Sequence, residues 1–245
     1  MKENSLKKNY SLLKKHSKNA GTVLFGVADI SKLKEDFIFE DRSVLDNLNY
    51  AVSIGMPLLA GVLETIRDKP TPLYFHHYRQ TNNVLDKLTN EISHFIQNKG
   101  FKAIPIPASQ IIDWKRQLAQ VSHRVIAYNA GLGWWGRNNL LVNPVYGSKA
   151  RYATILTDFP LQADGPLKNG CGVCVKCISV CPTNAINKDS RNFKREDCLE
   201  KLKEFARIPG IGQFICGICV KVCDGKSKIQ NSKFRNKVLY GKRNK

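Results

Sequence analysis

The sequence has few acidic residues for its length, and its basic excess is concentrated at the two ends. Its 245 residues include 20 Asp and Glu against 39 Lys and Arg, which gives a formal net charge of +19. Residues 1–20 contribute +5 and residues 224–245 contribute +7. Either these ends bind a nucleic acid or an acidic protein, or they are solvated basic tails. Aromatic residues are sparse among the charges, so composition does not decide between the two readings.

Long apolar runs are also missing. The longest apolar region, residues 50–63, is interrupted by Pro57 and two glycines and is too short to cross a bilayer. Residues 1–20 contain only Leu12 and Leu13 as an apolar pair, which is not the core of a signal peptide. We therefore expect no membrane segment and a cytoplasmic, reducing location. Hydrophobic residues make up 42% of the chain and charged residues 24%, proportions that exclude disorder over its whole length.

Cysteine is absent from the first 170 residues, and all eight cysteines lie between Cys171 and Cys223. In a reducing compartment such a concentration indicates metal ligands rather than disulfides.

The pattern before the cysteines predicts alternating strands and helices, hence a layered α/β or α+β core. Residues 1–20 read as a basic helix, and residues 82–99 as an amphipathic helix closed by Gly100. Residues 109–121 form a third predicted helix, capped by Ser109. Predicted strands cover residues 22–28, 50–56, 101–106, 140–142 and 152–157.

The cysteine spacing is the most specific signal in the chain. Four cysteines in the order C-x2-C-x2-C-x3-C, followed by Pro182, form the run that binds [4Fe–4S] clusters in two-cluster ferredoxins. In those proteins the fourth cysteine ligates the other cluster. We therefore expect one cluster on Cys171, Cys174, Cys177 and Cys223, and a second on Cys181, Cys198, Cys216 and Cys219.

Zinc is the main competing interpretation, because paired CxxC motifs also form zinc sites. The ferredoxin spacing with its proline favours clusters over zinc. Seventeen residues separate Cys198 from Cys216, a stretch that suggests a module docked on another domain rather than a free-standing carrier.

Residues 131–141 form a glycine- and tryptophan-rich loop, which on its own is either a tight turn or a binding loop for a planar cofactor. The strand and distal acid of a dinucleotide fingerprint are missing. Together with residues 143–148, 155–161 and the eight-cysteine layout, however, this loop resembles the epoxyqueuosine reductase family over roughly residues 75–223.

The resemblance implies cobalamin and two [4Fe–4S] clusters as cofactors, and removal of the epoxide oxygen from epoxyqueuosine on tRNA as the reaction. It implies an α+β fold with a corrinoid-binding, nitroreductase-like core at residues 1–165. A two-cluster ferredoxin-like module at 166–226 and a basic tail at 227–245 would follow. It also implies a ferredoxin or flavodoxin as electron donor, and a corrinoid pocket that includes Gly131, Gly133, Trp134, Gly136, Asn138 and Asn139.

Three departures from the family pattern affect this expectation. Gln80 stands where the family has a proton-donating Asp, and an amide cannot replace a carboxylic acid in that role. Asp224 follows Cys223 where the family usually has Pro. The chain continues for 22 residues beyond Cys223, without the helical-repeat tail implicated in tRNA binding.

The catalytic acid is therefore unassigned. The polar residues His76, His77, Tyr78 and Arg79 either supply it or belong to the scaffold. Three functions remain open at this stage: a corrinoid- and cluster-dependent reductase, an iron–sulfur electron carrier that serves a redox partner, and a nucleic-acid-binding iron–sulfur protein.

Overall fold

The computed structural model describes residues 2–168 and 170–225, which form two compact units. Unit 1 takes its described residues from Met1–Met56, Gln80–Gly133 and Arg151–Leu167. Unit 2 takes its described residues from Pro57–Arg79, Trp134–Ala150 and Lys168–Lys245. The cysteine-bearing unit thus includes two segments from the middle of the chain. The linear division at residues 165 and 226 remains a prediction, and the expected tail at 227–245 lies outside the described residues.

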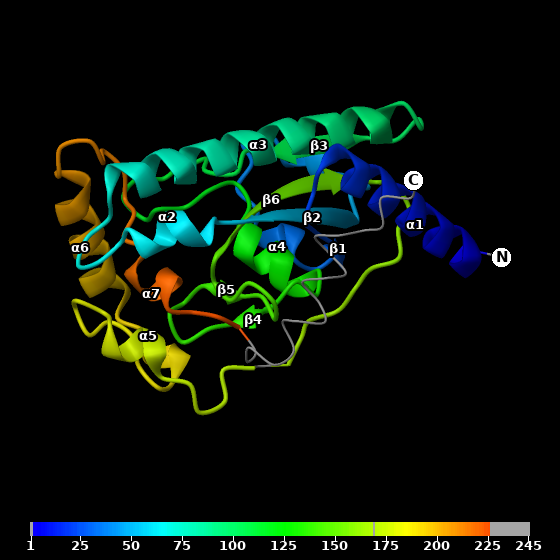
Figure 1. Ribbon diagram of the computed structural model, residues 1–245. Coiled ribbons are helices and arrows are strands. Elements are labelled where there is room, and N and C mark those ends of the chain that lie inside the picture. The colour runs from blue at the N-terminus through cyan, green and yellow to red at the C-terminus, as the bar shows by residue number, and fades with distance from the viewer. Residues whose placement is uncertain (1, 169, 226–245) are drawn as a thin grey trace, which may run out of the picture. The chain divides into compact units, whose positions relative to one another are not determined.

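Unit 1 is built on a four-stranded sheet with the order β1-β2-β6-β3 (Figure 1). β1 and β2 are antiparallel, with Phe25 opposite Ile54, and β3 and β6 are antiparallel, with Ile104 opposite Leu156. The structure confirms the four strands that were predicted from β-branched and apolar runs, to within a few residues. The strands are β1 (Leu24–Asp29), β2 (Tyr50–Pro57), β3 (Ala103–Ile106) and β6 (Ala150–Thr157).

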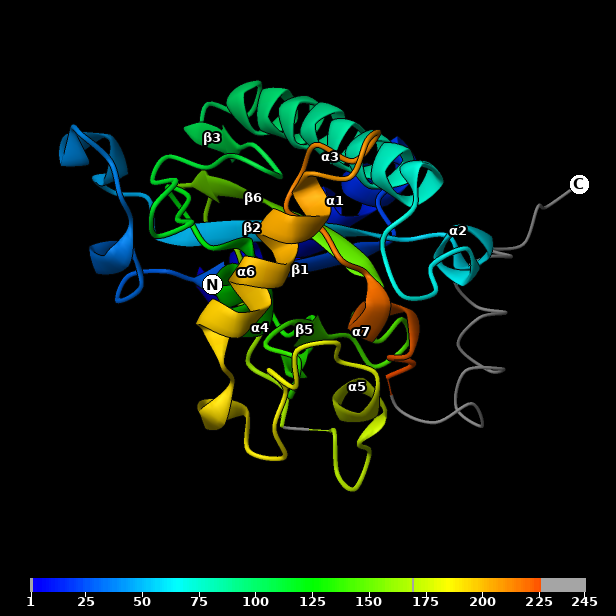
Figure 2. The same ribbon diagram turned by 90° about the vertical axis from the view of Figure 1, so that its left-hand side faces the viewer.

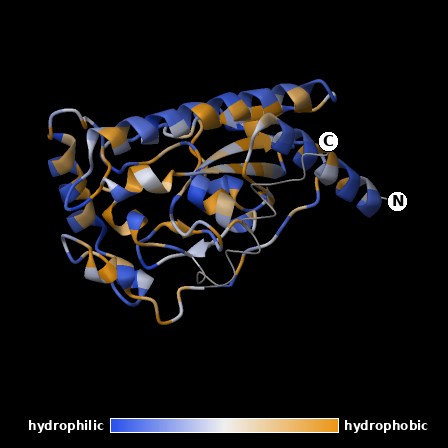
Figure 3. Cartoon of the chain, viewed as in Figure 1, coloured by the Kyte–Doolittle hydropathy of each residue, from blue (hydrophilic) through white to orange (hydrophobic). Residues whose placement is uncertain are grey.

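Helices cover both faces of this sheet. Figures 1 and 2 show α1 (Lys2–Ala20) and the later part of α3 (Pro72–Gln97) on one face, and α4 (His123–Asn129) on the other. The core between α1, α3 and the strands includes Leu13, Leu85, Ile92, Val52 and Ile155. Figure 3 shows the corresponding hydropathy, with apolar residues on the strands beneath a largely hydrophilic outer side of α3.

Two of the predicted helices differ from the structure. The helix expected at 82–99 begins ten residues earlier, because the Thr71 hydroxyl accepts from the Tyr74 N–H (3.1 Å) and so caps a helix that opens with Pro72. Its predicted end is confirmed, with Gly100 in the left-handed conformation (φ 85°).

The prediction of a helix at residues 109–121 is wrong. The Asp113 side chain accepts from the Arg116 N–H (2.7 Å), and Asp113 and Leu118 form an isolated antiparallel bridge. Asp113 thereby turns the chain back on itself where the hydrophobic pattern alone suggested a helix.

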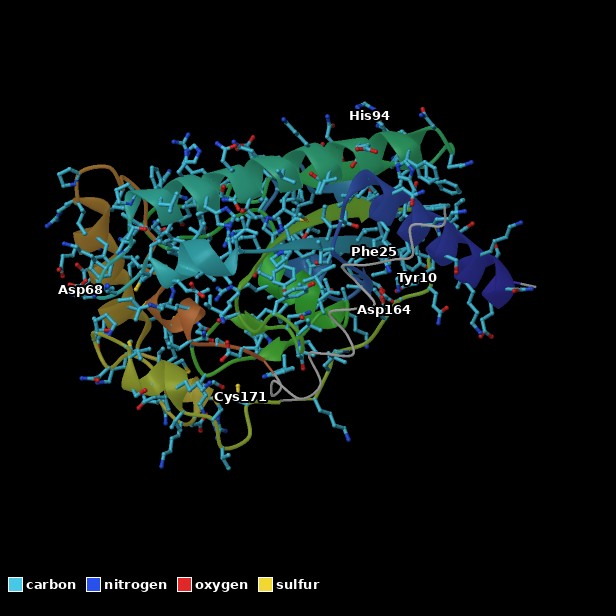
Figure 4. The ribbon with its side chains drawn as sticks, viewed as in Figure 1. Tyr10, Phe25, Asp68, His94, Asp164 and Cys171 are labelled. Atoms are coloured by element: carbon cyan, nitrogen blue, oxygen red, sulfur yellow. The ribbon has the colours of Figure 1, made fainter. Side chains whose placement is uncertain are left out.

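Hydrogen bonds of Asp164 hold the segment after β6 against β1 in unit 1. The Asp164 carboxylate accepts from the Val27 N–H (2.9 Å), and the Asp164 N–H donates to the Val27 carbonyl (2.7 Å). Tyr10 of α1 donates to the same carboxylate (3.1 Å) and lies edge-on to Phe25. Figure 4 labels Tyr10, Phe25 and Asp164. Burial, followed by the Asp164 charge, raises the pKa of Tyr10 well above its ordinary value. The Tyr10 hydroxyl therefore stays protonated and keeps donating its hydrogen bond to Asp164.

Unit 2 has short helices and a small hairpin around its own apolar core. α7 (Ile218–Lys221) lies against both α2 (Ala60–Glu64) and α5 (Lys176–Ser179). α6 (Arg195–Ala206) contributes Phe205 to the core, and β4 (Trp134–Trp135) pairs with β5 (Leu141–Val142). The core residues include Leu58, Leu63, Ile66, Tyr74, Phe205, Ile211, Ile215, Ile218 and Val220.

Single 3-10 turns complete the described chain. They are η1 (Lys34–Asp36) and η2 (Arg42–Leu45) in unit 1, and η3 (Ser190–Asn192) in unit 2. Within residues 2–168 and 170–225, none of the helices combines the length and the apolar character that crossing a bilayer requires.

Candidate functional site

Four cysteine thiols lie close together where the loop before α5 meets the segment after α7. The Cys174 N–H donates to the Cys171 carbonyl (2.9 Å), Cys177 lies in α5, and Cys223 follows α7. The pKa of Cys177 is raised to about 11 by burial and then by the charges of Cys223, Cys171 and Cys174. We call these four residues the first set. Figure 4 marks the place of Cys171.

The other four thiols form a second, more deeply buried set. Cys198 lies in α6 and Cys219 lies in α7. Cys181 precedes a short turn, and Cys216 lies two residues before α7 begins. The pKa of Cys216 is raised to about 11 by burial, with further contributions from the charges of Cys198 and Cys181. Burial also raises the pKa of Cys219 well above its ordinary value, and the charge of Cys216 adds to this effect.

The second set lines a cavity of about 50 Å³. All four of its thiols reach this cavity, and apolar side chains form most of the remaining wall. The apolar lining residues are Pro182, Ile186, Phe193 and Leu202, and the polar ones are Asn138, Thr183 and Lys201. Such a wall excludes water from whatever the thiols hold.

The two sets exchange one cysteine each between the sequence motifs. Cys181 comes from the first motif but lies with Cys198 and Cys216, whereas Cys223 comes from the second motif but lies with Cys177. The contact between α5 and α7 brings the two motifs together and permits this exchange. All eight cysteines are free of disulfides. The grouping has the same members as the two predicted ligand sets, and ligation itself stays a prediction.

The donor chemistry of both sets fits a cationic cluster. Burial and mutual repulsion raise the pKa of Cys177 and Cys216, so that neighbouring thiolates are costly without positive charge between them. Among the described residues, no three His, Cys, Asp or Glu side chains are close enough together to hold one metal ion. A zinc ion needs each thiolate about 2.3 Å from one centre. A cubane instead spreads four thiolates around four irons.

The glycine- and tryptophan-rich segment supports the cysteine sets within unit 2. The buried Trp134 indole N–H donates to the Cys171 sulfur (3.3 Å). The Arg137 guanidinium donates to the carbonyls of Gly172 (2.7 Å), Cys174 (2.8 Å) and Lys188 (2.8 Å). The buried Asn138 amide donates to the Ser148 hydroxyl (3.1 Å). These side chains hold the cysteine loop from outside its own motif.

The other residues predicted for a corrinoid pocket have local structural roles. Gly136 and Asn139 belong to the turn between β4 and β5, where the Asn139 N–H donates to the Gly136 carbonyl (3.0 Å). A side chain on Gly136 would approach Val142 to 2.5 Å, so this glycine is required for packing. Gly131 has a positive φ of 68° and Gly133 is buried, and both lie in unit 1. The assignment of these six residues to a corrinoid remains a prediction.

Sequence reasoning missed a second support, in which the turn at residues 143–147 holds Cys223. The Ser148 N–H donates to the Cys223 sulfur (3.3 Å), and a side chain on Gly147 would meet the Cys223 carbonyl oxygen at 1.9 Å. Asp224, noted earlier only as a departure from a proline, pairs with Lys149 (2.6 Å) and Lys176 (3.1 Å). The sequence offered one signal for this contact: residues 143–148 and the eight cysteines belong to the same family pattern.

Among the residues considered as proton donors, His77 has a structural role. The Leu59 N–H donates to the His77 ring nitrogen Nε2 (3.0 Å), so that this nitrogen is occupied as an acceptor. Burial, followed by the charge of His76, lowers the pKa of His77. Gln80 is exposed on α3. No residue is assigned as the catalytic acid.

The fold matches those of a reductive dehalogenase and of an epoxyqueuosine reductase. A reductive dehalogenase whose structure suggests a mechanism for B12-dependent dehalogenation has a TM-score of 0.73 and 17% identity, covering 95% of this chain and 34% of that one. Epoxyqueuosine reductase bound to an epoxyqueuosine-modified tRNA-Tyr stem loop has a TM-score of 0.59 and 21% identity, covering 87% and 64%. The chain thus has the fold shared by these two classes of reductase.

Sequence comparison points to one of these two classes, the epoxyqueuosine reductases. The epoxyqueuosine reductase of Aliivibrio fischeri is 31% identical over 184 residues, which cover 69% of this chain and 46% of that protein. The epoxyqueuosine reductase of Leadbetterella byssophila is 48% identical over 118 residues, which cover 44% and 38%. No family model matches the chain. The chain is a divergent relative of the epoxyqueuosine reductases, and it spans less than half the length of these curated proteins.

Proposed function

We propose that this protein is an iron–sulfur reductase that uses cobalamin, and that its substrate is epoxyqueuosine in tRNA. One observation carries the proposal. Eight cysteines fall into two coupled sets of four, in a chain whose fold matches a B12-dependent dehalogenase over 95% of its length.

The protein's part in electron handling follows from the two sets. Each set supplies four thiolates for one [4Fe–4S] cluster, and the apolar wall around the second set keeps water away from it. Trp134 and Ser148 donate hydrogen bonds to sulfurs of the first set, which stabilises their negative charge. Cobalamin, when bound, supplies low-potential cobalt chemistry, and the chain's task is to bind, orient and reduce it.

The proposed substrate and partners rest on charge and on the relatives. Epoxyqueuosine reductases are the curated relatives, and one of the matching structures holds a modified tRNA stem loop. The exposed Lys residues on α1 offer a basic surface for a polyanion, among them Lys7, Lys8, Lys15 and Lys18. A ferredoxin or flavodoxin remains the proposed electron donor. The cytoplasm remains the proposed compartment, because eight free cysteines are suited to a reducing environment.

Anaerobic reconstitution with iron, sulfide and cobalamin tests the cofactor content. We expect about eight irons per chain, since each cubane holds about four, and one bound corrinoid. Cluster formation without any corrinoid binding contradicts the cobalamin part and leaves an electron carrier. Failure to assemble clusters contradicts the whole proposal.

The loaded protein is then supplied with an excess of reduced ferredoxin or dithionite as the source of electrons and tested on an epoxyqueuosine-containing tRNA stem loop, with product analysis by mass spectrometry. Conversion to queuosine supports the proposal. A full set of cofactors without conversion contradicts the substrate. A salt titration of binding compares the stem loop with an unrelated polyanion, and equal affinity for both removes specific tRNA recognition.

A further inference from the structure

The loop of the first cysteine set is the most exposed part of the proposed cluster region. Residues 172–176 are all exposed. The Val173 side chain is 98% exposed, and Cys174 is the one cysteine of the eight in the exposed class. Val175, in the same loop, is 44% exposed, so the loop presents two apolar side chains to solvent beside a redox ligand. This arrangement suits contact with another molecule.

This loop is exposed but well braced. Arg137 donates to the carbonyls of Gly172 and Cys174 within the loop, and to that of Lys188 in a neighbouring segment, all at 2.7–2.8 Å. A surface fixed in this way loses little conformational freedom when a partner docks. It also keeps Cys174 in a fixed position within the exposed loop.

The rim of the loop is positively charged. Lys176 lies within it, and the three carbonyl contacts of Arg137 place Lys188 beside it. Lys149 is joined to Lys176 through Asp224. With Arg137 and Lys188 this makes four cations and one carboxylate, a balance of +3 that a cluster of about −2 does not cancel. Cationic rims around an apolar contact select acidic partners and speed their approach.

We infer that residues 172–176 are the docking surface for an acidic one-electron carrier, and that electrons enter the protein at the cluster of the first set. This inference rests on the proposed cluster sites. In the transfer, a reduced carrier loses one electron and the oxidised first cluster gains it, with no bond made or broken. Val173 provides the central apolar contact, and Lys176 and Lys188 provide the charged rim.

A charge placed at Val173 tests the surface. Reconstituted wild type and Val173→Asp are mixed with a reduced acidic ferredoxin or flavodoxin, and cluster reduction is followed by stopped-flow absorbance. We expect the variant to lower the second-order rate constant roughly tenfold, because it removes the apolar contact and repels the carrier. Reduction by dithionite, which does not need the docking surface, should be unchanged. Val84→Asp, at a 41% exposed valine on α3 in unit 1, is the matched control and should behave as wild type.

Several outcomes overturn the inference. An unchanged carrier rate in Val173→Asp does so, and so does a carrier rate that is insensitive to salt in the wild type. If Val173→Asp instead weakens binding of a tRNA stem loop and leaves the carrier rate intact, the surface belongs to nucleic acid and the inference is wrong. If dithionite reduction also falls, Val173→Ser decides, since it keeps the loop uncharged: a lower carrier rate with normal dithionite reduction supports docking, and a normal carrier rate contradicts it.

Iron content separates this test from the proposed function. A wild-type protein that fails to hold about eight irons contradicts the cluster proposal before any docking is measured. A fully loaded protein with an unaffected Val173→Asp variant contradicts the docking surface alone.

Discussion

The two cysteine sets differ mainly in their exposure to solvent. In the first set Cys174 is exposed, Trp134 and Ser148 donate to two of the sulfurs, and cations surround the loop. The second set lines a largely apolar cavity, although it too has a nearby cation, Lys201, and hydrogen bonds to the Cys181 sulfur. Burial opposes the more negative reduced cluster, so the exposure of the first set favours that state. We therefore expect the first cluster to have the higher reduction potential.

The largest effect should come from the exchanged cysteines. Cys181→Ser should remove the second cluster and Cys223→Ser the first, because each of these residues lies with the set that contains the other motif's cysteines. Each variant should keep about four of about eight irons. Iron analysis and electron paramagnetic resonance identify which cluster remains. Loss of the first cluster in Cys181→Ser would show that each motif ligates its own cluster.

Exposure should also separate the two clusters kinetically. An iron chelator should remove about half of the iron in a fast phase, since each cubane holds about four irons and Cys174 opens the first set to solvent. The second phase should be slower because apolar side chains surround the second set. Chelation followed by absorbance shows the phases, and the two cysteine variants assign them. A single phase of iron loss in the wild type would show that the two clusters do not differ in accessibility to the chelator.

A smaller effect is expected when one hydrogen bond to sulfur is removed. Trp134→Phe keeps an aromatic ring but loses the N–H that reaches the Cys171 sulfur. A hydrogen bond worth about 1 kcal/mol corresponds to about 40 mV for one electron, so the first cluster's potential should fall by that order. The second cluster in the same molecule is the control during a redox titration. Equal shifts in both clusters would indicate a general structural effect instead.

The smallest effect should follow from the ion pairs of Asp224. Asp224→Asn weakens the contacts with Lys149 and Lys176, which are partly exposed, so we expect a loss of at most about 1 kcal/mol in the free energy of unfolding. The first cluster's potential should rise slightly because a nearby negative charge is removed. Asp189→Asn, which breaks another exposed pair in unit 2, is the control for stability. A rise in potential as large in the control would contradict a specific effect of Asp224.

Local patterns in the sequence predicted the elements whose cause is local. Leu85, Leu88 and Ile92 recur at helical spacing and Gly100 can adopt a positive φ, so that α3 and its end were recognisable. The cap at Thr71 depends on a single hydroxyl contact, and the start of α3 was missed for that reason. The turn at Asp113 was missed because side-chain hydrogen bonds there outweigh an ambiguous hydrophobic pattern.

The candidate site was predictable only as far as its spacing. The intervals between cysteines predict the two ligand sets, because a ferredoxin-type run assigns each cysteine to a cluster, and ligation itself stays a prediction. The contacts from Trp134, Arg137 and Ser148 join residues 35 to 75 positions apart, and no local pattern records such a contact. Trp134 and Asn138 were predicted to line a corrinoid pocket, and the hydrogen bonds found for them lie within the cysteine unit.

The close approach of Gly147 to Cys223 limits how this protein can be taken apart. Residues 166–226 resemble a small ferredoxin in their cysteine spacing, yet a fragment cut at those points would lose the Ser148 amide, the Arg137 brace and the core residues Leu63 and Ile66. Transplanting the module into another protein would require residues 57–79 and 134–150 to travel with it. The smallest portable form of this cysteine module is therefore discontinuous in the gene, and a designer would have to join its three segments with new linkers rather than truncate the chain.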